Sequence, residues 1–226
     1  MKKFFLTLTT ISALTVAETA EQMQIKFSEI YQSNGWRGKE SVSGTGSDLK
    51  QTEAIRTSLP SLLKLLKINT MLDAACGDFH WMQQIDLSFL DFYFGVDIVP
   101  QMIKNNQQRY STSKRSFMHK NIAHDLLPKV DLIFCRDCLV HLELKDTLQV
   151  LKNFKRSGSK YILLTTFTRK SPNTNLPSWQ WRTLNMQLEP FNFPEPIALI
   201  NEQCTENNGE YTDKSLGLWR LSDINI

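Results

Sequence analysis

The stretch LDAACGDFHW, residues 72–81, follows an apolar run and combines small residues with two carboxylates. Ala75 and Gly77 let the backbone approach a ligand closely, while Asp73 and Asp78 can accept hydrogen bonds from cationic or hydroxyl groups. Two carboxylates would repel a pyrophosphate, and the G-x-G-x-x-G pattern of dinucleotide-binding turns is absent. The stretch therefore predicts a turn that binds a non-phosphorylated ligand with a positive charge.

Short apolar runs alternate with helical patterns around this turn. Such spacing is typical of strand-helix units in a parallel sheet that is covered on both faces. We expect a Rossmann-like, doubly wound, mostly parallel α/β sheet, in which the turn lies where ligands bind, outside the carboxyl ends of the strands. The expected strands are 70–74, 92–97, 130–135 and 161–166, and the expected helices are 48–67 with a kink at Pro60, 101–109 and 143–156, after a Gly- and Ser-rich loop over 35–47.

The C-terminal part of the chain has a different character. After Thr166 comes a stretch rich in Pro, Asn and Trp, which we expect to be a long ordered loop because its aromatic side chains can pack. Two strand candidates follow at 197–203 and 215–221, and Asn208-Gly209 between them suits a reversal. An antiparallel C-terminal strand pair is therefore expected.

Composition limits the classes of function. The 226 residues suit one domain, with 41% hydrophobic and 22% charged residues. The formal net charge is only +3 and the charges are interspersed, so nucleic acid is not an expected partner. No segment has the length and apolarity of a stable membrane span.

The N-terminus and the cysteines give opposite indications of compartment. Four unevenly spaced cysteines favour reduced thiols and a cytoplasmic location. Residues 1–17 instead resemble a secretory signal, with a Lys-Lys start and small residues near Ala17, although threonines dilute the apolar stretch. A start misassigned upstream of Met23 is a third reading. We expect a leader over 1–22 and one domain over 23–226, with export as the alternative.

The segment MLDAACGDF resembles the D-x-G-x-G-x-G loop of class I S-adenosylmethionine-dependent methyltransferases. Their cofactor carries an ammonium, a sulfonium and a ribose but no phosphate, in agreement with the charge argument. Of the three glycines only Gly77 matches, because Ala75 and Phe79 stand at the other two positions. Further stretches, from GWRGKESVSGTGS to DKSLGLWRL, are similar to one bacterial subfamily of these enzymes with no assigned substrate.

The resemblance implies a set of cofactor-binding residues. Asp97 would accept hydrogen bonds from the two ribose hydroxyls, as the family's second-strand acid does. Cys135 and Arg136 would close under the methionine end. The full set implied for S-adenosyl-L-methionine is Asp73, Ala75, Cys76, Gly77, Asp97, Ile98, Asn121, Ile122, Cys135 and Arg136.

The residues after the strand at 130–135 offer two chemistries. The segment CRDC can be a redox pair or half a zinc site, and Cys76, Cys135, Cys138 and His141 could gather at one end of the sheet. A structural zinc site usually repeats the C-x-x-C, which this chain does not, so we expect no metal. We expect His141 and Asp137 to be the catalytic residues, with His141 taking a proton from the acceptor, although packing of His141 is an equal alternative.

The expected function is methyl transfer from S-adenosylmethionine to a small molecule or a small exposed nucleophile. Trp36, Trp181 and Arg182 are candidates to line the substrate site, with Arg182 pairing a carboxylate or phosphate. Four alternatives stay open at this point: an aminopropyltransferase, a cofactor-binding regulator without catalysis, a secreted binding module, and a zinc or redox protein built on CRDC.

Overall fold

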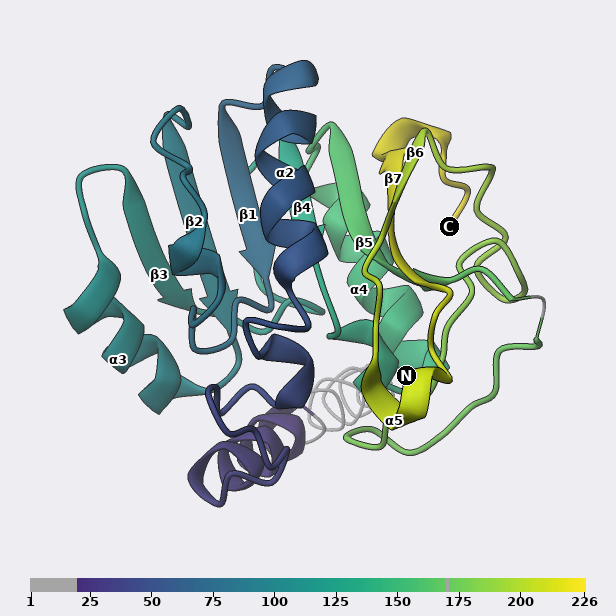
Figure 1. Ribbon diagram of the computed structural model, residues 1–226, viewed down its shortest axis with the longest axis horizontal. Coiled ribbons are helices and arrows are strands. Elements are labelled where there is room, and N and C mark those ends of the chain that lie inside the picture. The colour runs from purple at the N-terminus through teal and green to yellow at the C-terminus, as the bar shows by residue number, and fades with distance from the viewer. Residues whose placement is uncertain (1–19, 170) are drawn as a thin grey trace, which may run out of the picture.

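The computed structural model describes residues 20–169 and 171–226, and these form a seven-stranded sheet with helices on both faces (Figure 1). The strands lie in the order β3-β2-β1-β4-β5-β7-β6. Their bounds are β1 Thr70–Ala74, β2 Phe92–Asp97, β3 Arg115–His119, β4 Leu132–Cys135, β5 Tyr161–Phe167, β6 Ala198–Asn201 and β7 Lys214–Arg220.

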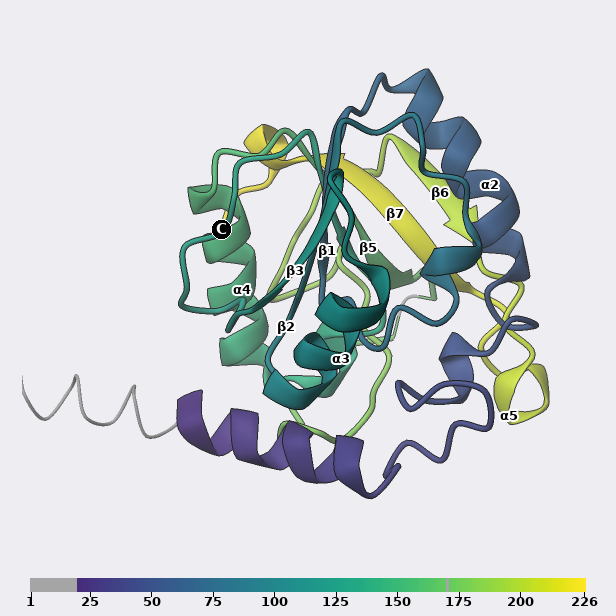
Figure 2. The same cartoon turned by 90° about the vertical axis from the view of Figure 1, so that its left-hand side faces the viewer.

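Helices cover the two faces of the sheet from different parts of the chain. Figure 2 shows α2 and α4 on opposite sides of the sheet, seen along its plane. The buried residues of α2 and Ile103 of α3 pack in one core with Met71 of β1, while the buried apolar residues of α4 pack in the other core with Leu72. The helices are α2 Glu53–Leu65, α3 Pro100–Tyr110, α4 Leu144–Arg156 and the short α5 Glu206–Gly209, and residues 20–32 form a further helix, called here the N-terminal helix.

The parallel part of the sheet confirms the predicted fold class. Strand β1 pairs in parallel with β2 on one side and with β4 on the other. The chain therefore winds outward in two directions from β1 and β4, and this reversal creates a crevice at their carboxyl ends. In Figure 1 the N-terminal helix lies below these ends.

The antiparallel end of the sheet is also as predicted. Strand β7 pairs antiparallel with β5 over seven residues and with β6 over four. Between β6 and β7, Asn207 and Asn208 adopt left-handed backbone angles within α5 and reverse the chain. The pair extends the sheet beyond the parallel core.

Strand β3, the N-terminal helix and the short α5 were not predicted, and β4 and α2 begin later than expected. Strand β3 alternates buried Phe117 with more exposed neighbours at the sheet edge, which leaves little apolar signal. The N-terminal helix falls across the expected leader boundary at residue 22, and residues 1–19 of that leader lie outside the described residues. Helix α2 begins only at Glu53 and continues through Pro60 as one element.

Within the described residues, no helix combines the length and apolarity needed to cross a membrane.

Candidate active site

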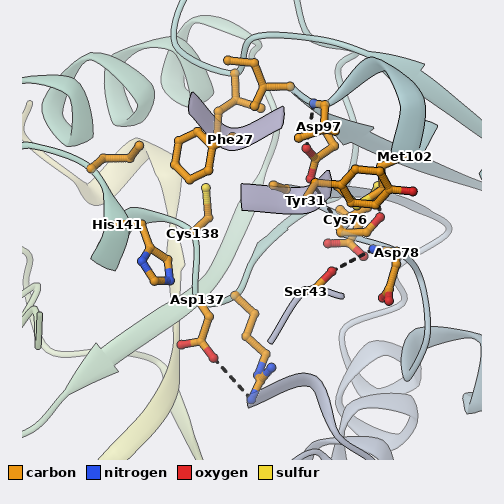
Figure 3. A pocket seen from close by; sticks show the side chains of 18 of the residues that line it. Phe27, Tyr31, Ser43, Cys76, Asp78, Asp97, Met102, Asp137, Cys138 and His141 are labelled. Atoms are coloured by element: carbon orange, nitrogen blue, oxygen red, sulfur yellow. Dashed lines mark hydrogen bonds and ion pairs between the residues drawn. The ribbon is translucent and has the colours of Figure 1, made fainter. Parts of the chain in front are cut away.

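A pocket opens at the carboxyl ends of β1, β2 and β4. The turn after β1, the residues after β2 and the loop after β4 form its floor, while the N-terminal helix and the 35–47 loop form its cover (Figure 3). In the close-up, Phe27, Cys138, His141 and Asp137 lie on one side, and Asp97, Cys76 and Asp78 lie on the other. Of the predicted site residues, the pocket brings together Trp36, Asp73, Ala75, Cys76, Gly77, Asp97, Ile98, Asn121, Ile122, Arg136, Asp137 and His141.

The turn after β1 is held close to both the sheet and the cover. The backbone amide of Cys76 donates to Val96 of β2, 2.9 Å away. Gly77 has a φ of 55°, and a Cβ there would stand 2.4 Å from the hydroxyl oxygen of Ser43. A side chain at this position would be strained and would collide, so the turn requires glycine.

Asp73 is a buried carboxyl group at the floor of the pocket. Tyr93 donates its hydroxyl to Oδ2 at 2.5 Å. Burial, opposed by this hydrogen bond, raises the pKa of Asp73 to about 8. At neutral pH the group is therefore largely protonated and can donate a hydrogen bond as well as accept one.

Asp97 lies at the end of β2 and binds two backbone amides. Gly77 donates to Oδ2 at 3.2 Å, and Val99 donates to Oδ1 at 3.0 Å. Burial raises the pKa of Asp97 to about 6, and the backbone hydrogen bonds limit that rise. At pH 7 the carboxylate is mostly ionised, with lone pairs left for a diol in the pocket.

The wall after β3 is formed by the segment 120–123. The side-chain Oδ1 of Asn121 accepts a hydrogen bond from the backbone amide of Ala123 at 2.9 Å. The backbone amide of Asn121 donates to Asp125 Oδ2 at 2.7 Å. Asn153 of α4 donates to the carbonyl of Ile122 at 2.7 Å. These bonds fix Asn121 and Ile122 against the side of the pocket beyond Asp97.

The 35–47 loop is tied to the turn after β1 through Asp78. Ser41 donates its hydroxyl to Asp78 Oδ2 at 2.8 Å, and the amide of Val42 donates to the same oxygen at 3.0 Å. Ser43 accepts from the amide of Asp78 at 3.0 Å, as Figure 3 shows. Asp78 therefore orders the cover, a role that the sequence did not indicate.

The N-terminal helix contributes Met23, Phe27 and Tyr31 to the pocket. Asn105 of α3 donates to the Tyr31 hydroxyl at 2.8 Å, which fixes the helix over the β2 side. The three residues are spaced i, i+4 and i+8, the pattern of one helix face. This spacing was a signal that the sequence offered and that our prediction did not use.

Four charged side chains meet under the loop after β4: Arg136, Asp137, Glu202 and Lys214. Arg136 Nη2 lies 2.7 Å from Glu202 Oε2, and Lys214 Nζ lies 2.5 Å from Asp137 Oδ2. Burial would raise the pKa of Asp137, but Lys214 and Arg136 outweigh it and lower the pKa to about 2. Asp137 is therefore ionised at neutral pH.

His141 packs against Trp36, with ring centroids 4.3 Å apart and ring planes tilted by 40°. Burial lowers the pKa of His141 to about 4, because desolvation outweighs the attraction of Asp137. Its Nδ1 is buried and has no hydrogen-bond partner among the described residues. A neutral imidazole with a free ring nitrogen can accept a hydrogen bond from an acceptor molecule.

Three predicted site residues do not line the pocket. Cys135 is buried at the end of β4, inside the core. Trp181 packs against Tyr211 and Phe167, with centroids 4.6 and 5.8 Å away. Arg182 is buried behind the pocket wall and donates to the carbonyl of Leu142.

The cysteines of CRDC are free thiols in the structure. Burial raises the pKa of Cys135 well above its ordinary value, so this group is not a thiolate. Among the residues described, no three His, Cys, Asp or Glu side chains come together in a way that could hold a metal ion.

The sheet order, the crevice and the acid at the end of β2 define the class I methyltransferase fold. Residues 72–157 match the family model described as "Methyltransferase domain". This match and the fold confirm the predicted resemblance to class I methyltransferases. A sequence search of curated proteins finds no match.

Solved structures share the fold at low sequence identity. NodS, an N-methyltransferase from Bradyrhizobium japonicum WM9 in complex with S-adenosyl-l-homocysteine, is 15% identical with a TM-score of 0.60, over 84% of this chain and 97% of that one. Human N-acetylserotonin methyltransferase in complex with SAM is 16% identical with a TM-score of 0.57, over 86% of this chain and 58% of that one.

A third match is shorter. The chain spans 63% of magnesium protoporphyrin IX methyltransferase from Synechocystis PCC 6803, at 16% identity and a TM-score of 0.41.

Proposed function

We propose that the protein binds S-adenosylmethionine in this pocket and transfers its methyl group to a small molecule or a small exposed nucleophile. The observation that carries the proposal is the Asp97 carboxylate, which faces the pocket from the end of β2 and is fixed by the amides of Gly77 and Val99. A carboxylate held in this way can accept both hydroxyls of a ribose.

The charges of the pocket fit this cofactor. Five carboxyl groups line it, Asp73, Asp78, Asp97, Asp137 and Asp146, against two cationic side chains, Lys120 and Arg136. With Asp73 protonated at neutral pH, four acids still face two cations, and this excess suits an ammonium and a sulfonium and disfavours a pyrophosphate. Gly77 lines the pocket without a side chain, so the backbone of the turn can approach the ligand closely.

The residues of the chain would align the reactants and exclude water. S-adenosylmethionine supplies a methyl group on a sulfonium, which a nucleophile takes by in-line displacement. Asp97 would hold the ribose, and Arg136 would lie near the carboxylate of the amino-acid end. Phe27, Met23 and Leu142 supply apolar surface that keeps water from the pocket.

We propose His141 and Asp137 as the residues that face the acceptor. With a pKa near 4, His141 stays neutral and suits the acceptance of a hydrogen bond from an O–H or N–H of the nucleophile. Trp36 would hold the imidazole in this orientation through the contact between the two rings. For Trp181 and Arg182, substrate contact stays a prediction that requires movement of the segment 178–182, since neither residue lines the pocket.

The first experiment is calorimetry with S-adenosylhomocysteine. The second measures transfer of the methyl group of S-adenosylmethionine to fractions of a small-metabolite extract. We expect binding, then turnover with at least one fraction. Binding without turnover on any fraction would favour the non-catalytic regulator, and absence of binding would reject the cofactor.

The zinc and redox alternative has its own test. We expect no stoichiometric zinc by elemental analysis and a fold that survives Cys138→Ser. A structural thiolate site contributes folding energy, so one equivalent of zinc together with unfolding on chelation would establish the metal protein instead.

We propose that the protein acts in the cytoplasm on a small-molecule substrate, without nucleic acid and without stable membrane insertion. The cysteines described are free thiols, which a reducing compartment preserves, and S-adenosylmethionine is made in the cytosol. Fractionation with N-terminal sequencing tests this proposal. A mature chain that starts at Glu18 outside the cytoplasm would show that residues 1–17 are a signal and that the leader boundary at 22 is wrong.

A further inference from the structure

The antiparallel pair β6–β7 reaches the pocket through two buried charged side chains. Lys214 begins β7 and Glu202 follows β6, and the amide of Glu202 donates to the carbonyl of Lys214 at 3.0 Å. Both side chains point to the loop after β4, and both are about 97% buried or more. Neither residue lies in the matched segment 72–157.

Glu202 holds one edge of the Arg136 guanidinium through a single carboxylate oxygen. Nε and Nη2 both donate to Oε2, at 3.1 and 2.7 Å. The same Nη2 also donates to the carbonyl of Gly46 in the cover, at 2.9 Å, and the guanidinium stacks over Trp81 at 5.4 Å. Arg136 is thus oriented by the C-terminal pair and by the cover together.

Lys214 has the corresponding role for Asp137. Its Nζ lies 2.5 Å from Asp137 Oδ2 and 3.4 Å from Glu202 Oε2. Without this cation, Asp137 would be free to draw Arg136 Nη2, now 3.5 Å from Oδ2, away from Glu202. Lys214 therefore keeps the Arg136–Glu202 ion pair apart from Asp137.

Fold stability alone gives a poor account of this cluster. Burying two ion pairs at the end of a sheet costs desolvation energy, and well-packed apolar residues would stabilise the fold at least as well. What the four charges do supply is a fixed direction for the two residues, Arg136 and Asp137, that line the pocket.

We propose that Glu202 and Lys214 are positioning residues that act on the cofactor through Arg136: Glu202 holds the guanidinium, and Lys214 keeps Asp137 from drawing it away. This inference rests on the proposed function, because it assigns Arg136 to the amino-acid end of S-adenosylmethionine. The C-terminal antiparallel pair is then part of the binding site as well as an extension of the sheet.

The test compares S-adenosylhomocysteine with 5′-methylthioadenosine, which has the same adenosine and thioether but lacks the amino-acid group. We expect Glu202→Gln to lower the affinity for S-adenosylhomocysteine about tenfold, the equivalent of one charge-assisted hydrogen bond. The affinity for methylthioadenosine should stay within about threefold of that of the unmutated protein. Lys214→Met should act in the same direction, and Lys214→Arg should restore most of the affinity. Asp223→Asn, which removes the acid of the exposed pair with Arg220 after the same strand, is the matched control.

A double-mutant cycle separates positioning from general damage. Arg136→Met leaves Glu202 paired with Lys214, so this background should fold, as a thermal melt can check. If Glu202 acts through Arg136, adding Glu202→Gln to the Arg136→Met variant should cause no further loss of affinity for S-adenosylhomocysteine. Equal loss of both ligands in Glu202→Gln, or a further loss in the Arg136→Met background, would overturn the inference. Failure of the unmutated protein to bind either ligand would instead reject the proposed function.

Discussion

The amide of Gly77 donates to Oδ2 of Asp97 across 3.2 Å, and this bond joins the turn after β1 to the end of β2. The two residues are 20 positions apart, yet the parallel pairing of β1 and β2 brings both to the same edge of the sheet. The geometry of the ligand turn and the direction of the carboxylate therefore depend on each other.

Asp97→Asn should lower the affinity for S-adenosylhomocysteine at least tenfold. The amide keeps the shape of the side chain, but it loses charge-assisted hydrogen bonds to the ribose, each worth about 1.5–3 kcal/mol. Isothermal calorimetry measures the change, and Asp91→Asn, an exposed acid just before β2, is the control. Unchanged affinity in Asp97→Asn would remove this residue from the site.

Affinity for S-adenosylhomocysteine should fall as the pH drops below about 6. The pKa of Asp97 in the free protein is about 6, so at pH 5 only a minority of the protein has the ionised form, and affinity should decline by about tenfold per unit below the pKa. Asp73, with a pKa of about 8, is already protonated in this range, and His141, with a pKa of about 4, is still neutral. Calorimetry at pH 7, 6 and 5 should show the decline in the unmutated protein, and a decline of the same size in Asp97→Asn would assign it to another group.

Asp73→Asn should stabilise the fold at pH 8 and have less effect at pH 5. Burial raises the pKa of Asp73 from 3.8 to about 8, so between these values the native state keeps a proton that the unfolded state loses. The free energy of unfolding contributed by this group therefore falls as pH rises from about 4 to 8. The neutral amide removes this loss and can still accept from Tyr93, with a gain on the order of 1–3 kcal/mol at pH 8. Urea unfolding at the two pH values measures it, and an equal shift at both would contradict the assignment.

The strand signals and the acid-flanked turn could be predicted from the sequence because they are local. Strands at 70–74 and 92–97 end where their apolar runs end, and Asp97 follows from its place after the second run. The contribution of Glu202 and Lys214 could not be predicted, since they meet Asp137 and Arg136 only after pairing of β5 with β7 brings together residues 66 and 77 positions apart.

The placement of Arg182 and Trp181 shows a different limit. Composition identified an aromatic, basic segment but carried no information on which side of the pocket wall it would lie. The amide of Arg182 donates to Val140 at 3.2 Å, which places this segment behind the wall. The position of Trp181 and Arg182 depends on the contact between their segment and the loop after β4, and sequence periodicity carries no information on such a contact.

Removal of residues 1–19 should leave S-adenosylhomocysteine binding intact, whereas Phe27→Ala should weaken it several-fold. Phe27 covers the pocket from the N-terminal helix. Replacing its side chain by alanine would expose the ligand to water and remove apolar contact worth about 1–3 kcal/mol. Glu29→Gln, an exposed residue of the same helix, is the control. Calorimetry on the three variants checks the prediction, and a loss of binding on removal of 1–19 would extend the functional domain into the predicted leader.

The 35–47 loop is joined to its surroundings by hydrogen bonds to side chains: Ser41 to Asp78, Thr45 to Glu206 at 2.6 Å, and Arg136 to the carbonyl of Gly46 at 2.9 Å. Breaking these bonds disturbs no strand pairing, so the loop can detach while the sheet stays folded. Its amides should therefore exchange with solvent through a local opening of lower free energy than global unfolding, and the same opening would admit the ligand. A bound ligand would then slow exchange at Val42 and Gly44 far more than at Leu72, and this difference reports how often the pocket opens.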